Sequence, residues 1–247
     1  MSKVVTTTVL PDVDGTSLTL GASGDNVVVT GNDLRVNVLQ DAGGNAMFTS
    51  NGSGVMSGMN SAFAGAEILI TTTTISSAVA NVAFTSGIDS TYDVYKFVFY
   101  DIGCSATWAY FSFNGSTDGG SNYNVTKTSV LWNADHTESG TTGGPQYEAA
   151  DDHAQGTGYQ YLGHALGGSD ADACAAGEIY LYAPSSTTYM KHWYSEEVEM
   201  YSNSARIIHN YTGGYFNTTS AINAIDFKMS TGNIDAGVIK MYGLSKS

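Results

Sequence analysis

The strongest constraint on the fold is an alternation of apolar and polar side chains within residues 211–244. In residues 225–229, Ile, Phe and Met alternate with Asp and Lys, which is the period of an amphipathic β-strand. Residues 230–233, Ser-Thr-Gly-Asn, are typical of a chain reversal, and residues 238–242 alternate again. We therefore expect a β-hairpin or two neighbouring strands, with the last strand tucked into a sheet because a free edge carrying Ile and Met would promote aggregation.

Candidate strands recur at short intervals through residues 67–247. We expect them at 67–75, 94–101, 107–114, 123–132, 158–166, 177–183, 189–201 (as two strands) and 205–210, before the two closing strands. Charged residues are only 13% of the chain, while Gly (29 residues) and Tyr (16) are abundant, which favours strands over helices. The sequence therefore predicts an all-β fold whose C-terminal part is an antiparallel β-sandwich, jelly-roll-like in its many short strands.

Residues 1–66 differ in kind from the rest. Very short runs of alternating Leu and Val, punctuated by Gly, Asn and Asp, occupy residues 17–38. They contain too little apolar surface to offset the entropy lost on folding alone. We expect either a shaft in which three chains wind around one axis or strands packed on the main domain of the same chain. A Gly-rich connector at 43–65 then leads to the domain at 67–247.

The charge balance excludes several partners. The chain has 23 acidic residues against 9 Lys and Arg, a formal net charge of −14, so nucleic acid or an anionic membrane would be repelled. No segment reaches the roughly 20 apolar residues of a membrane-spanning helix. The N-terminus lacks the apolar run of a signal peptide, so we expect folding in a cytoplasm. Cys104 and Cys174 are isolated, and each is expected to remain a thiol.

Residues 133–158 show no strand pattern and are rich in Gly, Asp, His and Glu. We expect a long exposed loop here, because such loops on rigid β scaffolds are frequent recognition sites. The candidate receptor-contact residues in and beside this loop are Trp132, Asp135, His136, Glu138, Tyr147, Asp151, Asp152 and His153. Carboxylates and imidazoles suit a metal site or an acid–base pair, but no HxH, HExxH or DxDxDG pattern occurs, and solvated turn residues explain the cluster without any function.

Three further groups carry weaker signals. The expected strands carry four acidic residues, Glu178, Glu196, Glu197 and Glu199. Two separated carboxylates can serve a glycoside hydrolase, but the expected account is an exposed strand face. Surplus tyrosines can form stacking platforms for sugars or fill the core and subunit interfaces. The Asp residues at 12, 14, 170 and 172 are interpreted as turn residues rather than Ca²⁺ ligands. We predict no enzyme activity, no catalytic residue, no metal and no cofactor.

The expected strand at 107–114 carries aromatic side chains on both faces. One face is expected to lie under the core, and the other under a loop or an adjoining subunit. Together with the small apolar content of residues 17–38, this pattern predicts a homotrimer.

Several segments resemble one group of proteins. They read NTTSAIN and IDFKMSTGNIDAGVIKMYG near the C-terminus, FTSGIDSTYDVYKFVF at 84–99, STDGGSNYNV at 116–125 and PSSTTYMKHWYS at 184–195. These sequences, within residues 67–247, resemble those of predicted tail-fibre or virion structural proteins of marine tailed bacteriophages. The resemblance implies a virion protein assembled in the host cytoplasm, a homotrimeric fibre or spike that is joined to other virion proteins by its N-terminal segment.

The expected function is therefore structural. The C-terminal sandwich would face outward and recognise a glycan or a protein on the host surface. One alternative is a decoration protein of the capsid surface that has no receptor. A polysaccharide-degrading spike is the other, and the absence of a spaced catalytic motif disfavours it.

Overall fold

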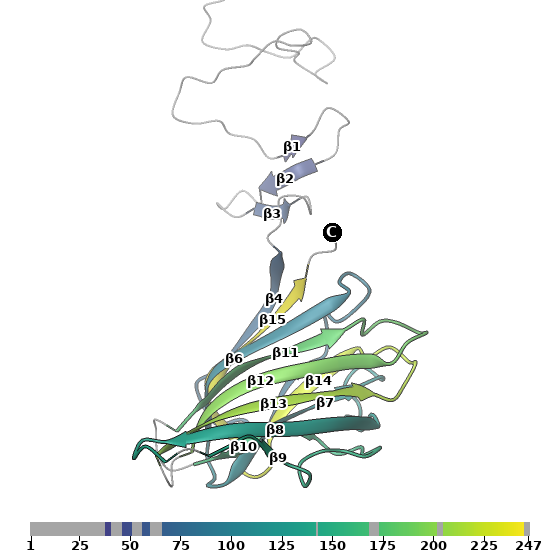
Figure 1. Ribbon diagram of the computed structural model, residues 1–247. Coiled ribbons are helices and arrows are strands. Elements are labelled where there is room, and N and C mark those ends of the chain that lie inside the picture. Colours follow the sequence, from purple (N-terminus) through teal and green to yellow (C-terminus); the bar gives the residue numbers. More distant parts are fainter. Residues whose placement is uncertain are drawn as a thin grey trace, which may run out of the picture. The chain divides into compact units, whose positions relative to one another are not determined.

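The computed structural model describes residues 38–40, 46–50, 56–59, 66–141, 143–167, 173–201 and 205–244 (Figure 1). The chain divides into two compact units, Met1–Asn60 and Ser61–Ser247. The described residues contain no helix that is long and apolar enough to cross a membrane. The expected shaft strands before residue 38 and the Asp residues at 12, 14, 170 and 172 lie outside the described residues.

The first unit contains a small antiparallel sheet. Its strands, in spatial order, are β1 (Val38–Gln40), β2 (Ala46–Ser50) and β3 (Met56–Met59). Two of them, β2 and β3, fall within the Gly-rich segment that the sequence identifies only as a connector. Whether three chains wind into a shaft here stays a prediction.

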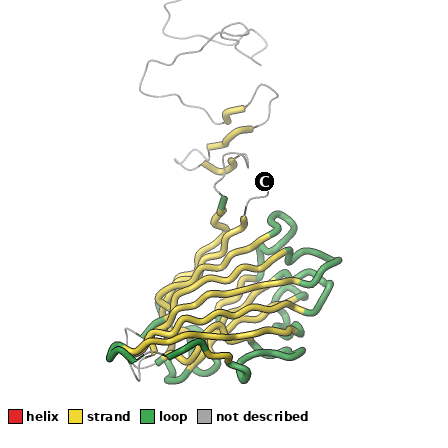
Figure 2. Tube along the Cα trace, viewed as in Figure 1, coloured by secondary structure: helices red, strands yellow, loops and turns green. Residues whose placement is uncertain are grey.

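The second unit is a sandwich of two antiparallel sheets, which Figure 2 shows as two layers of strands. The large sheet contains, in spatial order, β4 (Glu67–Ile75), β15 (Ile234–Leu244), β6 (Val94–Cys104), β11 (Ala175–Tyr182), β12 (Lys191–Tyr201), β13 (Arg206–Phe216), β8 (Lys127–Thr137) and β9 (Gln146–Tyr147). The small sheet contains β10 (Gln160–Leu166), β7 (Ala109–Ser116), β14 (Ala224–Met229) and β5 (Val82–Phe84). The predicted all-β sandwich is confirmed.

Aromatic side chains fill the space between the sheets. Phe227 of β14 lies at the centre, with ring centroids 5.5 Å from Phe97 and 5.6 Å from Phe111. Phe99 packs edge-on against Phe111 at 5.1 Å. All of these rings are buried, and full burial of one such side chain contributes about 1.5–3 kcal/mol. The inward face of the expected strand at 107–114 therefore lies under the core, as predicted.

The two closing strands do not form a hairpin, so that prediction is wrong. Strand β14 pairs with β7 and β5 in the small sheet, whereas β15 pairs with β4 and β6 in the large one. The turn at 230–233 thus carries the chain from one layer to the other. A hairpin and such a crossing show the same local alternation, because each buries one face of each strand. The last strand does lie inside a sheet, as predicted.

Several strands are longer than the sequence predicts, and β6 and β13 continue to Cys104 and Phe216. Residues 191–201 form the single strand β12 instead of two. Strand β8 continues to Thr137, and the short strand β9 pairs with it, so the expected loop at 133–158 is partly strand. The inward positions of β8 at this end are occupied by the polar residues Asn133 and Asp135, so the sequence lacks the alternation of apolar and polar residues from which a strand is predicted. Neither Cys104 nor Cys174 is in a disulfide bond within the described range.

Candidate functional site

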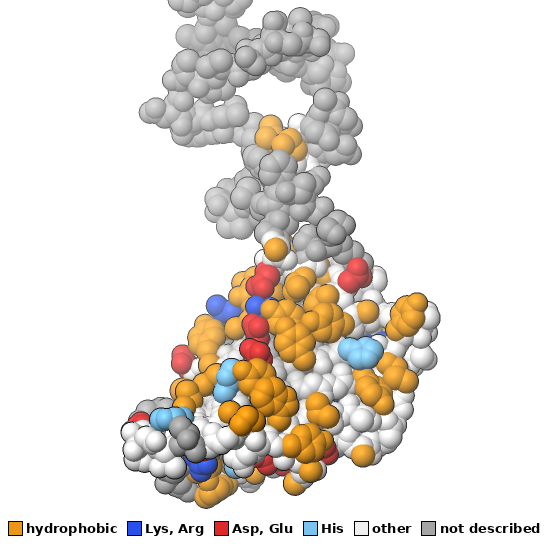
Figure 3. Space-filling view, viewed as in Figure 1, with side chains coloured by type: hydrophobic (Ala, Val, Ile, Leu, Met, Phe, Trp, Pro, Cys, Tyr) orange, Lys and Arg blue, Asp and Glu red, His pale blue; other side chains and the backbone are white. Residues whose placement is uncertain are grey.

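The outward face of the large sheet carries a group of aromatic side chains that no described element covers. They project from β8, β11, β12 and β13, where alternate residues point away from the core. Figure 3 shows hydrophobic side chains gathered in clusters on this face, with acidic and basic residues beside them. Exposed apolar groups that gather in this way mark interaction surfaces more often than isolated ones do. We call this group the aromatic face; it consists of Trp132 on β8, Tyr147 on the adjoining strand β9, Tyr180 and Tyr182 on β11, Tyr194 on β12, and His209 and Tyr211 on β13.

The first cluster of the aromatic face joins two neighbouring strands. Tyr180 and Tyr182 lie two residues apart on β11, and register pairing places Tyr194 of β12 opposite Tyr180. The rings of Tyr180 and Tyr194 are nearly parallel, with centroids 5.0 Å apart, and Tyr182 lies 6.2 Å from Tyr194. Partial burial, with Tyr182 and Tyr180 nearby, raises the pKa of Tyr194 to about 12. Its phenol is therefore protonated at neutral pH and can donate a hydrogen bond.

The second cluster lies on β8 and β13. Trp132 is 42% exposed and stacks on Tyr211 with centroids 4.2 Å apart and planes 13° apart. His209 lies 4.3 Å from the Tyr211 ring. Tyr147 of β9 is paired opposite Trp132, and its hydroxyl donates a hydrogen bond to the carboxylate of Asp152. This cluster presents ring faces and ring nitrogens together.

Gly213 leaves a gap in the layer of side chains on the aromatic face. It pairs with Tyr194 on one side and with Val130 on the other. A Cβ at this position would find only ordinary contacts, 3.7 Å from the carbonyl oxygen of Trp193 and 3.8 Å from the Cβ of Tyr194. The backbone at Gly213 is therefore open to a ligand that lies across the sheet.

A row of charges borders the first cluster. Lys96 of β6 forms ion pairs with Glu178 at 2.9 Å and with Glu67 at 3.1 Å, and its Nζ lies 5.2 Å from the Tyr180 ring centroid. Glu196 is paired opposite Glu178 on β12 and is exposed. The polar groups beside the rings are thus mainly hydrogen-bond acceptors.

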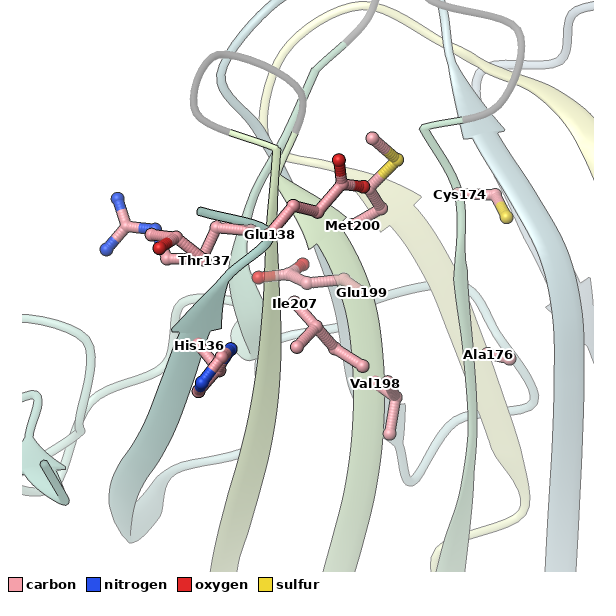
Figure 4. Close-up of a pocket in the computed structure, with 10 residues that line it drawn as sticks. His136, Thr137, Glu138, Cys174, Ala176, Val198, Glu199, Met200 and Ile207 are labelled. Atoms are coloured by element: carbon pink, nitrogen blue, oxygen red, sulfur yellow. The ribbon is translucent and has the colours of Figure 1, made fainter. Parts of the chain in front are cut away.

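The predicted receptor-contact residues do not form one surface. Trp132 and Tyr147 belong to the aromatic face. His136 and Glu138 line a pocket of about 420 Å³ at the end of the same sheet, together with Val198, Met200 and Ile207 (Figure 4). Asp135 points to the other side of β8, where it is nearly buried in an ion pair with Arg206 at 2.8 Å.

The remaining three predicted residues, Asp151, Asp152 and His153, line a separate cavity of about 460 Å³. Tyr159, Tyr161 and Lys228 also line it, together with Ser112 and Ser230. The Nζ of Lys228 lies 4.0 Å from the centroid of the Tyr159 ring, and the Tyr159 hydroxyl donates to Asp226 at 2.7 Å. Partial burial raises the pKa of the Asp151 carboxyl. The cavity mixes acids with one lysine, and its two serine hydroxyls are bonded to backbone groups: Ser112 donates to the carbonyl oxygen of Lys228, and Ser230 accepts from the amide of Tyr110.

The expectation that Glu197 and Glu199 lie on an exposed strand face is wrong. Both point into the sandwich and are buried, whereas Glu196 points outward. The sequence did contain a signal for this. Trp193 and Tyr201 are separated from both glutamates by even numbers of residues, so all four side chains lie on the same buried face of β12. Strand β10 covers Glu197 at Gly163, and Glu199 is only 2% exposed at the wall of the pocket beside Val198, so neither carboxyl group lies on an open strand face.

Comparison of the chain with protein-family models, with curated proteins and with solved structures gives no match. The function is therefore inferred from the geometry of the molecule and from its sequence.

Proposed function

We propose that this protein is a non-catalytic structural component of a bacteriophage virion, a homotrimeric fibre or spike whose β-sandwich binds a glycan on the host surface through the aromatic face. The observation that carries the binding role is the pair of exposed aromatic clusters on either side of Gly213. The virion assignment rests on the resemblance of residues 67–247 to virion structural proteins.

Stacked, exposed aromatic rings suit a sugar ligand. A tyrosine or tryptophan ring offers an apolar surface to the C–H face of a pyranose and a polar edge to its hydroxyls. Tyr194 and Trp132 lie on different strands, so a chain of sugars that crosses the sheet can contact both clusters. The glycine between them lets the ligand approach the backbone. Such a surface also loses little side-chain entropy on binding, because the rings are already held by stacking.

The charge of the molecule restricts the glycan. With a net charge of −14, and with Glu178 and Glu196 beside the rings, an acidic polysaccharide would be repelled. A neutral glycan or one that carries amino groups fits the acceptors on this face. We therefore propose a neutral or amino-bearing surface polysaccharide as the ligand.

Aromatic substitution tests the proposal. Purified protein is titrated with neutral polysaccharide from the host surface, and the affinity is compared for the wild type and for the Trp132→Ala and Tyr194→Ala variants. Each variant should bind at least about tenfold more weakly, since an aromatic contact is worth of the order of 1 kcal/mol beyond its buried area.

Trp108→Ala is the matched control. Trp108 is similarly exposed but packs against Tyr201 and lies outside the aromatic face. An equal loss of affinity in this variant would remove the aromatic face from the proposal. Release of oligosaccharide during the titration would contradict the non-catalytic assignment.

A further inference from the structure

The interior of the sandwich contains a polar cluster that the proposed function does not use. Glu197 and Glu199 of β12 are 1% and 2% exposed, and Asn210 of β13 is fully buried beside them. Glu197 pairs directly with Asn210 across the two strands, and Glu199 follows two residues later on the same face. Two carboxyl groups and an amide therefore share one enclosed space.

None of these groups is satisfied by the rest of the described chain. Both oxygens of Glu197, both oxygens of Glu199 and both polar atoms of the Asn210 side chain lack a hydrogen-bond partner among the described residues. The hydroxyl of Ser195, on the same face of β12, lacks one as well. Native proteins leave few buried polar atoms unpaired, so this many in one place indicates a missing partner.

The opposite sheet closes the space. Gly163 of β10 lies directly over the cluster, and a Cβ there would clash with Oε2 of Glu197 and lie 2.7 Å from Nδ2 of Asn210. The Glu197 and Asn210 side chains thus converge at one point below β10. The absence of a side chain at Gly163 leaves this point to them.

The lysine side chains of the described chain that are buried or half-buried near the sandwich bond to groups other than Glu197 and Glu199. The ammonium groups of Lys127 and Lys191 donate hydrogen bonds to backbone carbonyl oxygens of Gly158, Tyr189 and Thr218. Lys96 lies on the outward face of the large sheet and pairs with Glu67 and Glu178. The charge of Glu197 and Glu199 is therefore not balanced by these three lysines.

We propose that Glu197, Glu199 and Asn210 bind a buried hard divalent cation, Ca²⁺, which joins strand β12 to β13 beneath β10. Two carboxylates neutralise the two charges of the ion, and the amide of Asn210 supplies an oxygen when its side chain is turned by 180° about its last bond. Ser195, two residues before Glu197 on the same face of β12, has an unpaired hydroxyl that can supply a further oxygen. The ion links two neighbouring strands of the large sheet on their inward side, so it is independent of the glycan site on the outward side.

The ligand set selects the kind of ion. No group of three or more His, Cys, Asp or Glu side chains is placed to hold a metal in the described part of the chain, so a zinc site is not favoured. Carboxylate, amide and hydroxyl oxygens are ligands that Ca²⁺ accepts in irregular geometry. A proton shared between Glu197 and Glu199 would satisfy two oxygens and leave Asn210 unpaired. The cation accounts for more of the unpaired atoms than the proton does.

The titratable groups that face the carboxyl pair come from several elements. They are Tyr110 on β7, Tyr201 on β12 and Cys104 on β6. Burial raises the pKa of Glu199 to about 7, and the Asn210 amide and the backbone of His164 lie near enough to offset part of this rise without reaching hydrogen-bond geometry. Burial and the neighbouring Glu199 raise the pKa of Glu197 well above its usual value. Protons therefore compete with the cation, and binding should strengthen as the pH rises.

Refolding tests the site, because an enclosed ion exchanges only when the chain opens. The full chain is unfolded and refolded at pH 8 with either 1 mM Ca²⁺ or a chelator, and metal content and thermal midpoint are measured. We expect one Ca²⁺ per chain and a Tm about 5–10 °C higher than in chelator. A calcium-free protein with the same Tm in both buffers would overturn the proposal.

Matched glutamine variants locate the ion. Glu197→Gln and Glu199→Gln keep the shape of the side chain, so each should lose the bound Ca²⁺ and the Tm shift while folding in chelator at least as well as the wild type. Glu196→Gln changes the outward-facing neighbour on the same strand and should keep both. A shift that survives in the two inward variants, or is lost in Glu196→Gln, would place the ion elsewhere. Loss of wild-type stability with rising pH and no response to Ca²⁺ would show a shared proton instead.

Discussion

On strand β12, Glu197 and Glu199 point into the sandwich and are buried, whereas Tyr194 and Val198 point to solvent with 40% and 38% of their surface exposed. An antiparallel sheet that has one solvated face ordinarily shows the opposite partition. The interior face of the same sheet shows the usual one at Phe97 of β6, whose ring packs against Phe227 of the small sheet. The reversal is therefore local to β12 and its neighbours.

The buried glutamates and the exposed aromatic residues of β12 both carry a free-energy cost in the places they occupy. Buried carboxyl groups lose hydration, and exposed aromatic rings keep apolar surface in water. Proteins break local rules of this kind at functional sites more often than elsewhere. We accordingly place a ligand at each feature: a cation at the buried carboxyl groups inside the sandwich, and a glycan at the exposed aromatic rings outside it.

Removal of one aromatic ring on each side should give the largest contrast. Phe227→Ala removes a fully buried ring that contacts both Phe97 and Phe111, so the free energy of unfolding should fall by about 3–5 kcal/mol. Tyr194→Ala, on the aromatic face, should lower it by less than about 1 kcal/mol, because its ring is already partly in water. Urea unfolding of both variants gives the values. Similar losses would show that the aromatic face is packed as tightly as the core.

The pH dependence of stability should follow the buried carboxyl groups. A raised pKa means that the folded state favours the protonated form, so the contribution of Glu199 is present below about pH 4.5 and is lost as the pH rises through about 7. In chelator, Glu199→Gln should gain roughly 1–3 kcal/mol over the wild type between pH 4.5 and pH 8.

The measured quantity is the difference between this variant and the wild type, since Asp151 and Asp226 also have raised pKa values and titrate in both proteins. Chemical unfolding of both proteins at several pH values gives this difference in the free energy of unfolding. A difference that does not change with pH would mean that Glu199 is charged throughout.

Two adjacent glycines of β13 should respond with opposite signs. Gly214 faces the interior, where a Cβ would clash with the carbonyl oxygen of Thr128 and lie 2.8 Å from the Trp193 ring, so Gly214→Ala should cost about 1–3 kcal/mol. Gly213 faces outward with space for a Cβ, and Gly213→Ala should stabilise the strand by about 0.5–1 kcal/mol. Thermal unfolding of the pair checks both signs. A destabilised Gly213→Ala variant would show that the outward side of β13 is covered.

The smallest effect is expected at the margin of the aromatic face. Tyr147→Phe removes only the hydroxyl that donates to Asp152, and the Tyr147 side chain is 58% exposed. The free energy of unfolding should change by less than about 0.5 kcal/mol. If the glycan contacts the Tyr147 hydroxyl, affinity should fall in this variant although stability does not. A change in stability of more than about 1 kcal/mol would indicate that β9 anchors the edge of the large sheet.

The sequence alone predicted the all-β class, the strand Glu67–Ile75 to the residue and the burial of the last strand. These follow from alternation with a period of two and from turn residues, which are local properties of the chain. The buried face of β7 was predicted for the same reason, because Phe111 and Phe113 lie two residues apart and therefore on one face of the strand.

Only the tertiary structure decided which sheet each strand joins and what covers each face. Strands β14 and β15 lie in different layers although a short turn links them, and the layer is chosen by partners that are distant in sequence. Glu197 is buried because β10 crosses above it, whereas Tyr194 remains exposed because no described element lies over it. Alternation shows that two faces differ, but burial depends on contacts between residues far apart along the chain, and these set the positions of both ligand sites proposed here.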